Sequence, residues 1–173
     1  MDNFTARSSG RRDVIRLRAG APVKNTGKTR YNMLDMTGER LVQISPGLSY
    51  LHNPRHRDGS PSKSQWTINY AEELTCFKES HAHSWLLIDT GWGLHFSNQK
   101  ADHLGISCDK LRSLFIAKFI ANDNPSYWHG YPADYQVNVR DIPSLEILNN
   151  WMANQIFSRA KIRKILKGQP CRF

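Results

Sequence analysis

The stretch Gln65–Phe96, QWTINYAEELTCFKESHAHSWLLIDTGWGLHF, decides the fold class because its pattern of apolar residues changes along its length. It begins with Gln65–Ile68, a short run typical of a strand. Asn69 and Glu72 then have the spacing of a helix cap, in which the Asn side chain accepts a hydrogen bond from a free N–H of the first turn. Apolar residues on one face predict a helix over about 70–80, with its glutamates on the solvated side.

The end of the same stretch predicts a β-hairpin. Trp85–Ile88 is a compact apolar run, Asp89–Gly91 forms a turn, and apolar residues alternate through Trp92–Phe96. Outside this stretch, Leu41–Ile44 predicts another strand, which ends at Ser45-Pro46-Gly47. Together these elements predict an α+β fold in which a small, mostly antiparallel sheet is flanked by helices.

Two helices are predicted near the C-terminal end. Pro143 can open the first, because the N–H that proline lacks has no partner in the first turn anyway. Ser158 can cap the second helix, and Gly168 ends it. Two helices joined by a short turn follow the helix-turn-helix plan.

The segment 97–116 also resembles the general helix-turn-helix sequence pattern, in the spacing of Ala101, Gly105, Leu111 and Leu114. In that pattern glycine occupies the turn, where φ is positive, and the two leucines hold the second helix down. A plain helix hairpin is the alternative. Residues 111–121 fit either a helix or a buried strand.

The charge of the chain is concentrated at its two ends. The 173 residues include 24 Lys and Arg and 15 Asp and Glu, for a net charge of +9. Counted by segment, the net charge is +6 for residues 1–30, +1 for 31–63, −4 for 64–150 and +6 for 151–173. We therefore expect a disordered basic arm over residues 1–32 and a single α+β domain over 33–173, which ends in the basic helix pair. A polyanion is expected to meet the two ends.

The second C-terminal helix is the first candidate binding element. Its five cations fall within nine residues, without the alternating acids expected of a merely solvated face. The residues predicted to bind phosphates are Arg159, Lys161, Arg163, Lys164 and Lys167, together with Arg11, Arg12 and Arg16 of the arm. The alternative is a basic helix that only packs on the domain.

The stretch Tyr127–Tyr135 is predicted to be a loop dense in functional groups. Its imidazole can act as a general acid or base near neutral pH, a carboxylate can orient it, and flanking cations can hold a phosphate. The candidate catalytic set is His129, Asp134, Lys118 and Arg140, the composition of a metal-independent, ribonuclease-like site. The same loop fits a platform on which Trp128 and Tyr131 stack on bases, or a purely structural turn.

No metal or cofactor is expected. The histidines and cysteines lack the short paired spacings that zinc favours, and neither a phosphate-binding loop nor a dinucleotide-binding glycine motif is present. Cys76, Cys108 and Cys171 are odd in number and widely spaced, which favours reduced thiols in the cytoplasm. No apolar run is long enough to cross a membrane, so no membrane partner is expected. Residues 52–64 form a long polar loop, which is typically functional or disordered.

Three functions follow from these patterns. The leading hypothesis is a nucleic-acid-binding protein of bacterial or phage type that acts through its basic ends, on DNA or RNA. The first alternative is a small metal-independent ribonuclease that uses the loop around His129. The second is a protein-interaction module, an inhibitor or adaptor, that docks through its acidic, tryptophan-rich middle, where Trp66, Trp85 and Trp92 lie.

Overall fold

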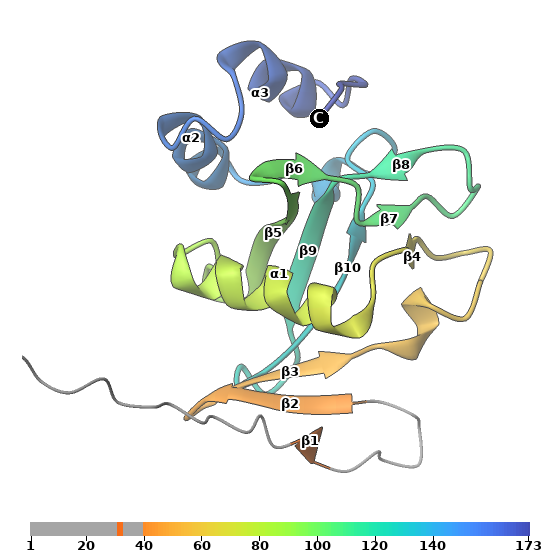
Figure 1. Ribbon diagram of the computed structural model, residues 1–173, viewed down its shortest axis with the longest axis vertical. Coiled ribbons are helices and arrows are strands. Elements are labelled where there is room, and N and C mark those ends of the chain that lie inside the picture. The colour runs from red at the N-terminus through yellow and green to blue at the C-terminus, as the bar shows by residue number, and fades with distance from the viewer. Residues whose placement is uncertain (1–30, 33–39) are drawn as a thin grey trace, which may run out of the picture.

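The computed structural model describes residues 31–32 and 40–173, and it confirms the α+β class (Figure 1). The large sheet is formed by β1 (Tyr31–Asn32), β2 (Arg40–Ser45), β3 (Leu48–His52), β5 (Thr90–Ser97), β6 (Lys100–Asp102), β9 (Ile116–Ala121) and β10 (Tyr127–Ala133). The small sheet is formed by β4 (Gln65–Trp66), β7 (Gly105–Ile106) and β8 (Ser113–Leu114). The helices are α1 (Tyr70–Ala82), α2 (Leu145–Ala153) and α3 (Arg159–Leu166), with 3-10 turns η1 (Pro54–His56) and η2 (Val139–Asp141).

The large sheet differs from the small, mostly antiparallel sheet that was expected. Its seven strands have the order β1-β2-β3-β10-β9-β5-β6, and the sheet is mixed because β3 and β10 run parallel. In Figure 1, β2 and β3 cross the direction of β5 and β9, so the sheet is curled. The parallel contact pairs Tyr50 with Trp128, which lie far apart in the sequence. Local patterns do not specify such a pairing, and this is why the prediction was wrong.

Helix α1 covers one face of the large sheet, and its predicted cap is confirmed. Asn69 Oδ1 accepts hydrogen bonds from the backbone N–H groups of Ala71 and Glu72, at 2.9 and 3.0 Å, and the Glu72 side chain accepts one from the Asn69 N–H at 2.8 Å. The helix crosses β5 at Gly93, where a Cβ atom would lie 2.3 Å from Ser80 Oγ. A glycine is therefore required for this close approach.

One glutamate of α1 is not solvated as expected. Glu73 is only 1% exposed and accepts hydrogen bonds from Tyr50 Oη at 2.7 Å and from Arg57 Nη2 and Nε at 2.5 and 3.1 Å. His52 Nδ1 lies 3.1 Å from the same carboxylate. The buried charge is thus paired within the core, as burial of a carboxylate requires.

The segment 97–116 contains three short strands and no helix, so the helix hairpin and the helix-turn-helix predicted for it were both wrong. Asn98 and Gln99 have positive φ values, 49° and 64°, and form the tight turn between β5 and β6. Gly105 lies in β7, where a Cβ atom would come 2.7 Å from the carbonyl oxygen of Gln65. This glycine serves close strand packing rather than a turn between helices, and the local spacing does not distinguish the two roles.

Two further predictions for the sheet are corrected. The hairpin predicted within 85–96 is reduced to a single bridge between Leu86 and Gly91, because β5 pairs instead with β6 and β9. The ambiguous segment 111–121 forms β8 and β9. The predicted loop Tyr127–Tyr135 is largely strand β10, which pairs with β9 from Trp128 to Ala133.

The two C-terminal helices and the Ser158 cap are confirmed, but α2 begins at Leu145 after the cap residue Ser144, so Pro143 precedes the helix and does not open its first turn. Ser144 and Ser158 accept hydrogen bonds from the backbone N–H groups of Ile147 and Lys161. Gly168 follows α3 with a φ of 62°, a left-handed conformation that favours glycine. Both helices pack on a second core cluster that includes Trp85, Trp151 and Ile165.

Candidate functional site

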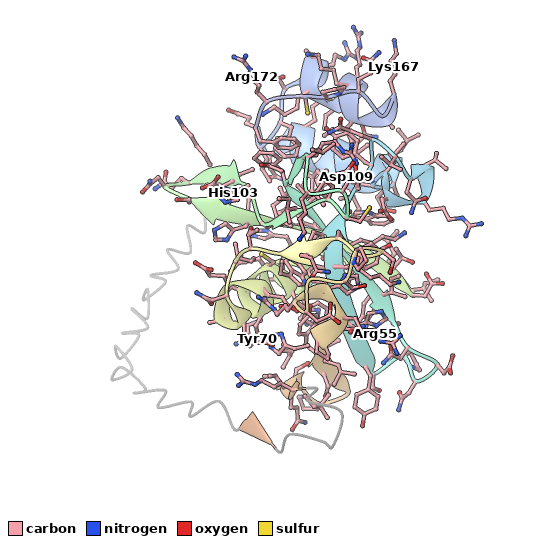
Figure 2. All side chains as sticks on the ribbon, turned by 90° about the vertical axis from the view of Figure 1, so that its right-hand side faces the viewer. Arg55, Tyr70, His103, Asp109, Lys167 and Arg172 are labelled. Carbon is pink, nitrogen blue, oxygen red and sulfur yellow. The ribbon has the colours of Figure 1, made fainter. Side chains whose placement is uncertain are left out.

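The apolar and charged residues of α3 lie on opposite faces. Ile162 and Ile165 are buried against the core. The cations predicted to bind phosphates lie on the other face. Four of them are exposed, Arg159, Arg163, Lys164 and Lys167, and Lys161 is half-buried. Figure 2 shows Lys167, with Arg172 of the C-terminal tail, at the far end of the molecule from Tyr70.

The exposed cations of α3 have no acidic partners in the part of the chain that the structure describes. The ion pairs found there join other residues. Lys161 differs from the rest because its Nζ lies over the rings of Phe157 and Phe173, 5.1 and 4.9 Å from their centroids. The free positive charge of the helix therefore lies mainly on its other four cations.

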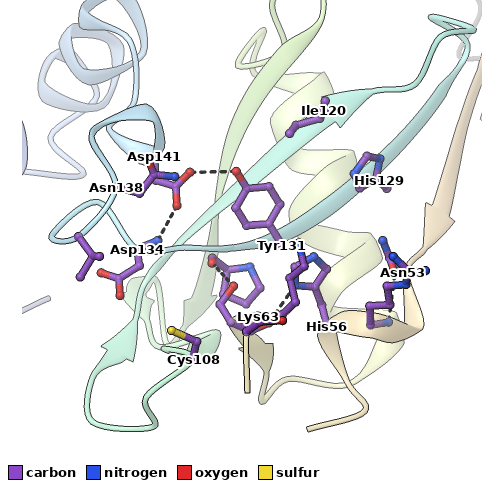
Figure 3. A pocket seen from close by; sticks show the side chains of 15 residues that line it. Asn53, His56, Lys63, Cys108, Ile120, His129, Tyr131, Asp134, Asn138 and Asp141 are labelled. Carbon is purple, nitrogen blue, oxygen red and sulfur yellow. Dashed lines mark hydrogen bonds between the residues drawn. The ribbon is translucent and has the colours of Figure 1, made fainter. Parts of the chain in front are cut away.

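A cavity of about 500 Å³ opens on the face of the large sheet opposite α1 (Figure 3). The strand β10 contributes the side chains that alternate away from the α1 face. The loop between β3 and β4 forms a second wall, and the segment after β10 forms a third. Strand β10 contributes His129 and Tyr131 to the cavity. The loop between β3 and β4 contributes His56 and Lys63, and the segment after β10 contributes Asp134 and Asp141.

The loop between β3 and β4 is held in place by the buried Gln65. The Gln65 Nε2 atom donates to the carbonyl oxygens of Arg55 and Lys63, at 3.2 and 3.1 Å, and Oε1 accepts from the Gly59 N–H at 2.9 Å. Ser64 Oγ donates to the carbonyl of Pro132 at 2.6 Å and so joins the loop to β10. The long polar loop predicted over 52–64 is therefore an ordered wall of the cavity.

His56 is fixed by a stack and by a hydrogen bond. Its ring is stacked on that of Tyr131, with centroids 5.3 Å apart and planes 15° from parallel. Nδ1 lies 2.9 Å from the carbonyl oxygen of Ser64. Because a carbonyl oxygen only accepts, Nδ1 carries the proton and Nε2 keeps its lone pair in the neutral ring. Burial, aided by the charge of Lys63, lowers the pKa of His56 from its ordinary value of 6.5.

His129, on β10, is also held through a hydrogen bond at its Nδ1 atom. Its Nδ1 lies 2.8 Å from Oδ1 of Asn122, so Nδ1–H donates to the amide oxygen and Nε2 keeps its lone pair. Burial lowers the pKa of His129 as well. The orienting group is thus Asn122, from the turn that precedes β10, and not the predicted Asp134.

The four residues predicted as a catalytic set do not meet. Asp134 accepts hydrogen bonds from Arg112 Nη2 and Nε, at 2.9 and 3.3 Å. Lys118 Nζ donates to the backbone carbonyl of Arg140 at 2.5 Å and lies 3.5 Å from an Asp141 oxygen. The side chain of Arg140 is exposed and is not among the residues that line the cavity. Of the predicted set, only His129 and Asp134 line it.

Of the two residues predicted to stack on bases, one lies in the core and the other lines the cavity. Trp128 is 4% exposed, and its indole Nε1 donates to the carbonyl of Pro125, so it belongs to the core and cannot stack on a base. Tyr131 lines the cavity and donates from Oη to Asp141 at 2.9 Å. Burial and the nearby carboxylate raise the pKa of Tyr131 well above its ordinary value.

The described residues contain no cluster of possible metal ligands. No three His, Cys, Asp or Glu side chains lie close enough there to hold an ion together. Cys76 is buried, and burial raises the pKa of its thiol to about 12, which opposes a thiolate ligand. Cys108 is exposed.

Three residues of this site were not predicted from the sequence: His56, Lys63 and Asn122. The polar composition of segment 52–64 was the available signal for the first two, but it did not indicate which strand the loop would contact. The arm residues Arg11, Arg12 and Arg16 lie outside the described residues.

Comparisons with known proteins add no assignment. No family model, no curated protein and no solved structure matches this chain. Within the described residues, no helix has both the length and the apolar character needed to cross a membrane.

Proposed function

We propose that this chain binds nucleic acid and contacts phosphates through α3 and the N-terminal arm. The observation that carries the proposal is the exposed face of α3, where Arg159, Arg163, Lys164 and Lys167 have no acidic partner in the described part of the chain. The phosphates of a nucleic-acid backbone can pair with these cations, and the counterions that the phosphates then release favour binding. Arg11, Arg12 and Arg16 would extend the same contact. We expect this function in the cytoplasm, where the cysteines stay reduced.

The position of α3 supports a path along which a bound strand would run from the cations of this helix to the cavity. Gly168, just after the helix, lies against the segment that follows β10, since a Cβ atom there would be 3.3 Å from the Tyr135 carbonyl oxygen. Tyr135 Oη donates to the carbonyl of Gln169 at 3.3 Å. Because Asp134 and Val137 line the cavity, the end of α3 and the cavity share one segment of chain. A cavity of about 500 Å³ has the size of a small-ligand site and can accept one nucleotide of a bound strand.

The salt dependence of binding tests this proposal. The variant Lys164→Gln/Lys167→Gln removes two cations from α3, and Lys78→Gln/Lys100→Gln removes two exposed cations from α1 and β6 as a matched control. Fluorescence anisotropy with labelled single-stranded RNA, single-stranded DNA and duplex DNA measures affinity from about 50 mM salt upward.

The α3 variant is expected to bind more weakly and to reduce the slope of log K against log salt. The expected reduction is roughly 1.4 for a single strand or 1.8 for a duplex, since each phosphate contact contributes about 0.7 or 0.9. The control variant should keep the wild-type slope. Absence of binding at about 50 mM salt, or equal effects of the two variants, would overturn the proposal.

The structure weakens the protein-docking alternative in its original form. Trp66, Trp85 and Trp92 are 6%, 1% and 6% exposed, so their rings pack in the core and do not form a surface. The ribonuclease alternative gains a specific observation, because a second histidine, His56, joins His129 in the cavity.

A further inference from the structure

Two histidines face one cavity with the same nitrogen free. His56 and His129 both line it, and each Nδ1 is held by a carbonyl or amide oxygen. Neither Nε2 has a hydrogen-bond partner among the described residues, and neither is among the buried polar atoms that lack one. Both rings line the cavity, His56 as a buried side chain that is 6% exposed and His129 as a half-buried one.

Strand β10 relates the two rings, because His129 lies on it and His56 of η1 stacks on its Tyr131. His129 and Tyr131 are two residues apart in this strand, so they point to the same face with a spacing of roughly 7 Å. The ring of His56 lies on Tyr131, 5.3 Å between centroids. A charge on His129 also contributes to lowering the pKa of His56, which agrees with this proximity. In Figure 3 both imidazoles lie to the right of the Tyr131 ring.

The charges around the cavity favour an anion. Arg55 and Lys63 line it from the loop between β3 and β4. Its two carboxylates are each paired with a cation: Asp134 with Arg112 at 2.9 Å and Asp141 with Lys118 at 3.5 Å. Because the acids are paired, the two rim cations set the local charge that a phosphodiester would meet.

We propose that this cavity cleaves RNA by metal-independent transphosphorylation. The 2′-oxygen attacks the adjacent phosphorus and forms a new P–O bond, while the bond from phosphorus to the 5′-oxygen breaks. The Nε2 of one histidine takes the proton of the 2′-hydroxyl, and the other histidine, protonated, gives its proton to the departing 5′-oxygen. The products are a 2′,3′-cyclic phosphate and a free 5′-hydroxyl, and Lys63 stabilises the charge on the phosphoryl oxygens.

This chemistry goes beyond the proposed binding function, although both require the chain to meet nucleic acid. The step needs a 2′-hydroxyl as its nucleophile, so DNA cannot react by it. It needs no metal, because two proton transfers and a nearby cation suffice. Attack of water on the cyclic phosphate, with the two histidines in exchanged roles, returns both to their starting protonation states.

The pH profile of kcat/KM is expected to be bell-shaped, with its centre on the acidic side of pH 6.5. One histidine must be neutral and the other protonated, and the pKa of each is lowered from 6.5. The charged groups that act on His56 are Lys63 and His129, which lower its pKa, and Glu73, which raises it. Activity should fall as pH rises, because the proton donor is then lost.

The test uses ribodinucleoside monophosphates, which are too short to reach α3 and so separate cleavage from binding to the basic helix. Wild-type protein is incubated with them in the presence of EDTA at pH values from about 4.5 to 8, and products are identified by mass spectrometry. We expect a 2′,3′-cyclic phosphate from the ribonucleotides and no reaction when the 2′-hydroxyl is replaced by hydrogen.

The variants His129→Gln and His56→Gln should each lower kcat/KM by about 10²–10⁴-fold, the usual contribution of general acid–base catalysis. His103→Gln, which changes an exposed histidine away from the cavity, is the matched control and should keep wild-type activity. Since His56 packs against Tyr131, its variant is compared with His129→Gln, whose half-exposed ring can be changed with less disturbance, and folding is checked by circular dichroism. Cleavage that is absent across this pH range, or that survives in folded His129→Gln, would overturn the proposal even if binding to long nucleic acid is observed.

Discussion

The buried ion pair between Arg57 and Glu73 gives the sharpest prediction for stability. Arg57 joins the loop before β4 to the first turn of α1, and the two side chains are 16% and 1% exposed. Replacing Arg57 by methionine removes the cation, both of its hydrogen bonds to the carboxylate and its bond to the Ile68 carbonyl. The charge of Glu73 is then left with only Tyr50 and His52 as polar neighbours.

The expected cost of Arg57→Met is about 3–5 kcal/mol at pH 7, the usual penalty for stranding a buried charge. For a domain of this size that cost lowers the melting temperature by about 10 °C. Urea unfolding followed by tryptophan fluorescence measures the free energy directly.

Two further variants isolate the carboxylate as the cause. In Arg57→Met/Glu73→Gln the charge is gone, so the double variant should be more stable than Arg57→Met alone. Glu79→Gln breaks an exposed pair with His83 and should cost less than about 1 kcal/mol. The reasoning is refuted if Arg57→Met costs less than about 1 kcal/mol, or if the double variant is as unstable as Arg57→Met.

Two other predictions concern single residues. An Ellman titration of native protein should label Cys108 rapidly and leave Cys76 unreacted, because Cys76 is buried with a pKa raised to about 12; equal rates for both would contradict its burial. Gly105→Ala should destabilise the protein by about 1–3 kcal/mol in the same urea assay, because its Cβ would lie 2.4 Å from Pro132 and 2.7 Å from the Gln65 carbonyl; an unchanged midpoint would show that these neighbours move aside easily.

The features predicted correctly from the sequence are those fixed by neighbours in the chain. Asn69 with Glu72, Ser158 and Gly168 each satisfy or end a helix through groups only a few residues away, and all three helix termini are found as expected. Tyr127–Tyr135 was predicted as a loop because its composition resembles one. Its strand conformation depends on pairing with β9 and β3, which the local sequence does not specify.

In the candidate site, too, local sequence identified single residues but not the contacts between residues that are distant in the chain. His129 was identified because an imidazole among aromatic and acidic residues is conspicuous in one stretch of sequence. Its partner His56 comes from a loop more than seventy residues earlier, and the two meet only because β3 and β10 run side by side. Asp134 was chosen for its nearness in sequence, yet Arg112 binds it. Nearness in sequence does not give contact here, because five residues of extended chain separate the two positions by roughly 16 Å.

The distribution of charge by segment is a poor guide to the charge at the cavity. Residues 64–150 carry a net −4, which suggests a region that repels phosphate. The two acids of this region that line the cavity, Asp134 and Asp141, are each paired with a cation, while the rim cations Arg55 and Lys63 lie in a segment with a net charge of only +1. Pairing in three dimensions thus offsets the two acids of the cavity, which a count of charge by segment does not reveal. The proposed cleavage depends on the cavity and not on the basic ends, and this is why cleavage of a dinucleotide and binding of a long strand are separable experiments.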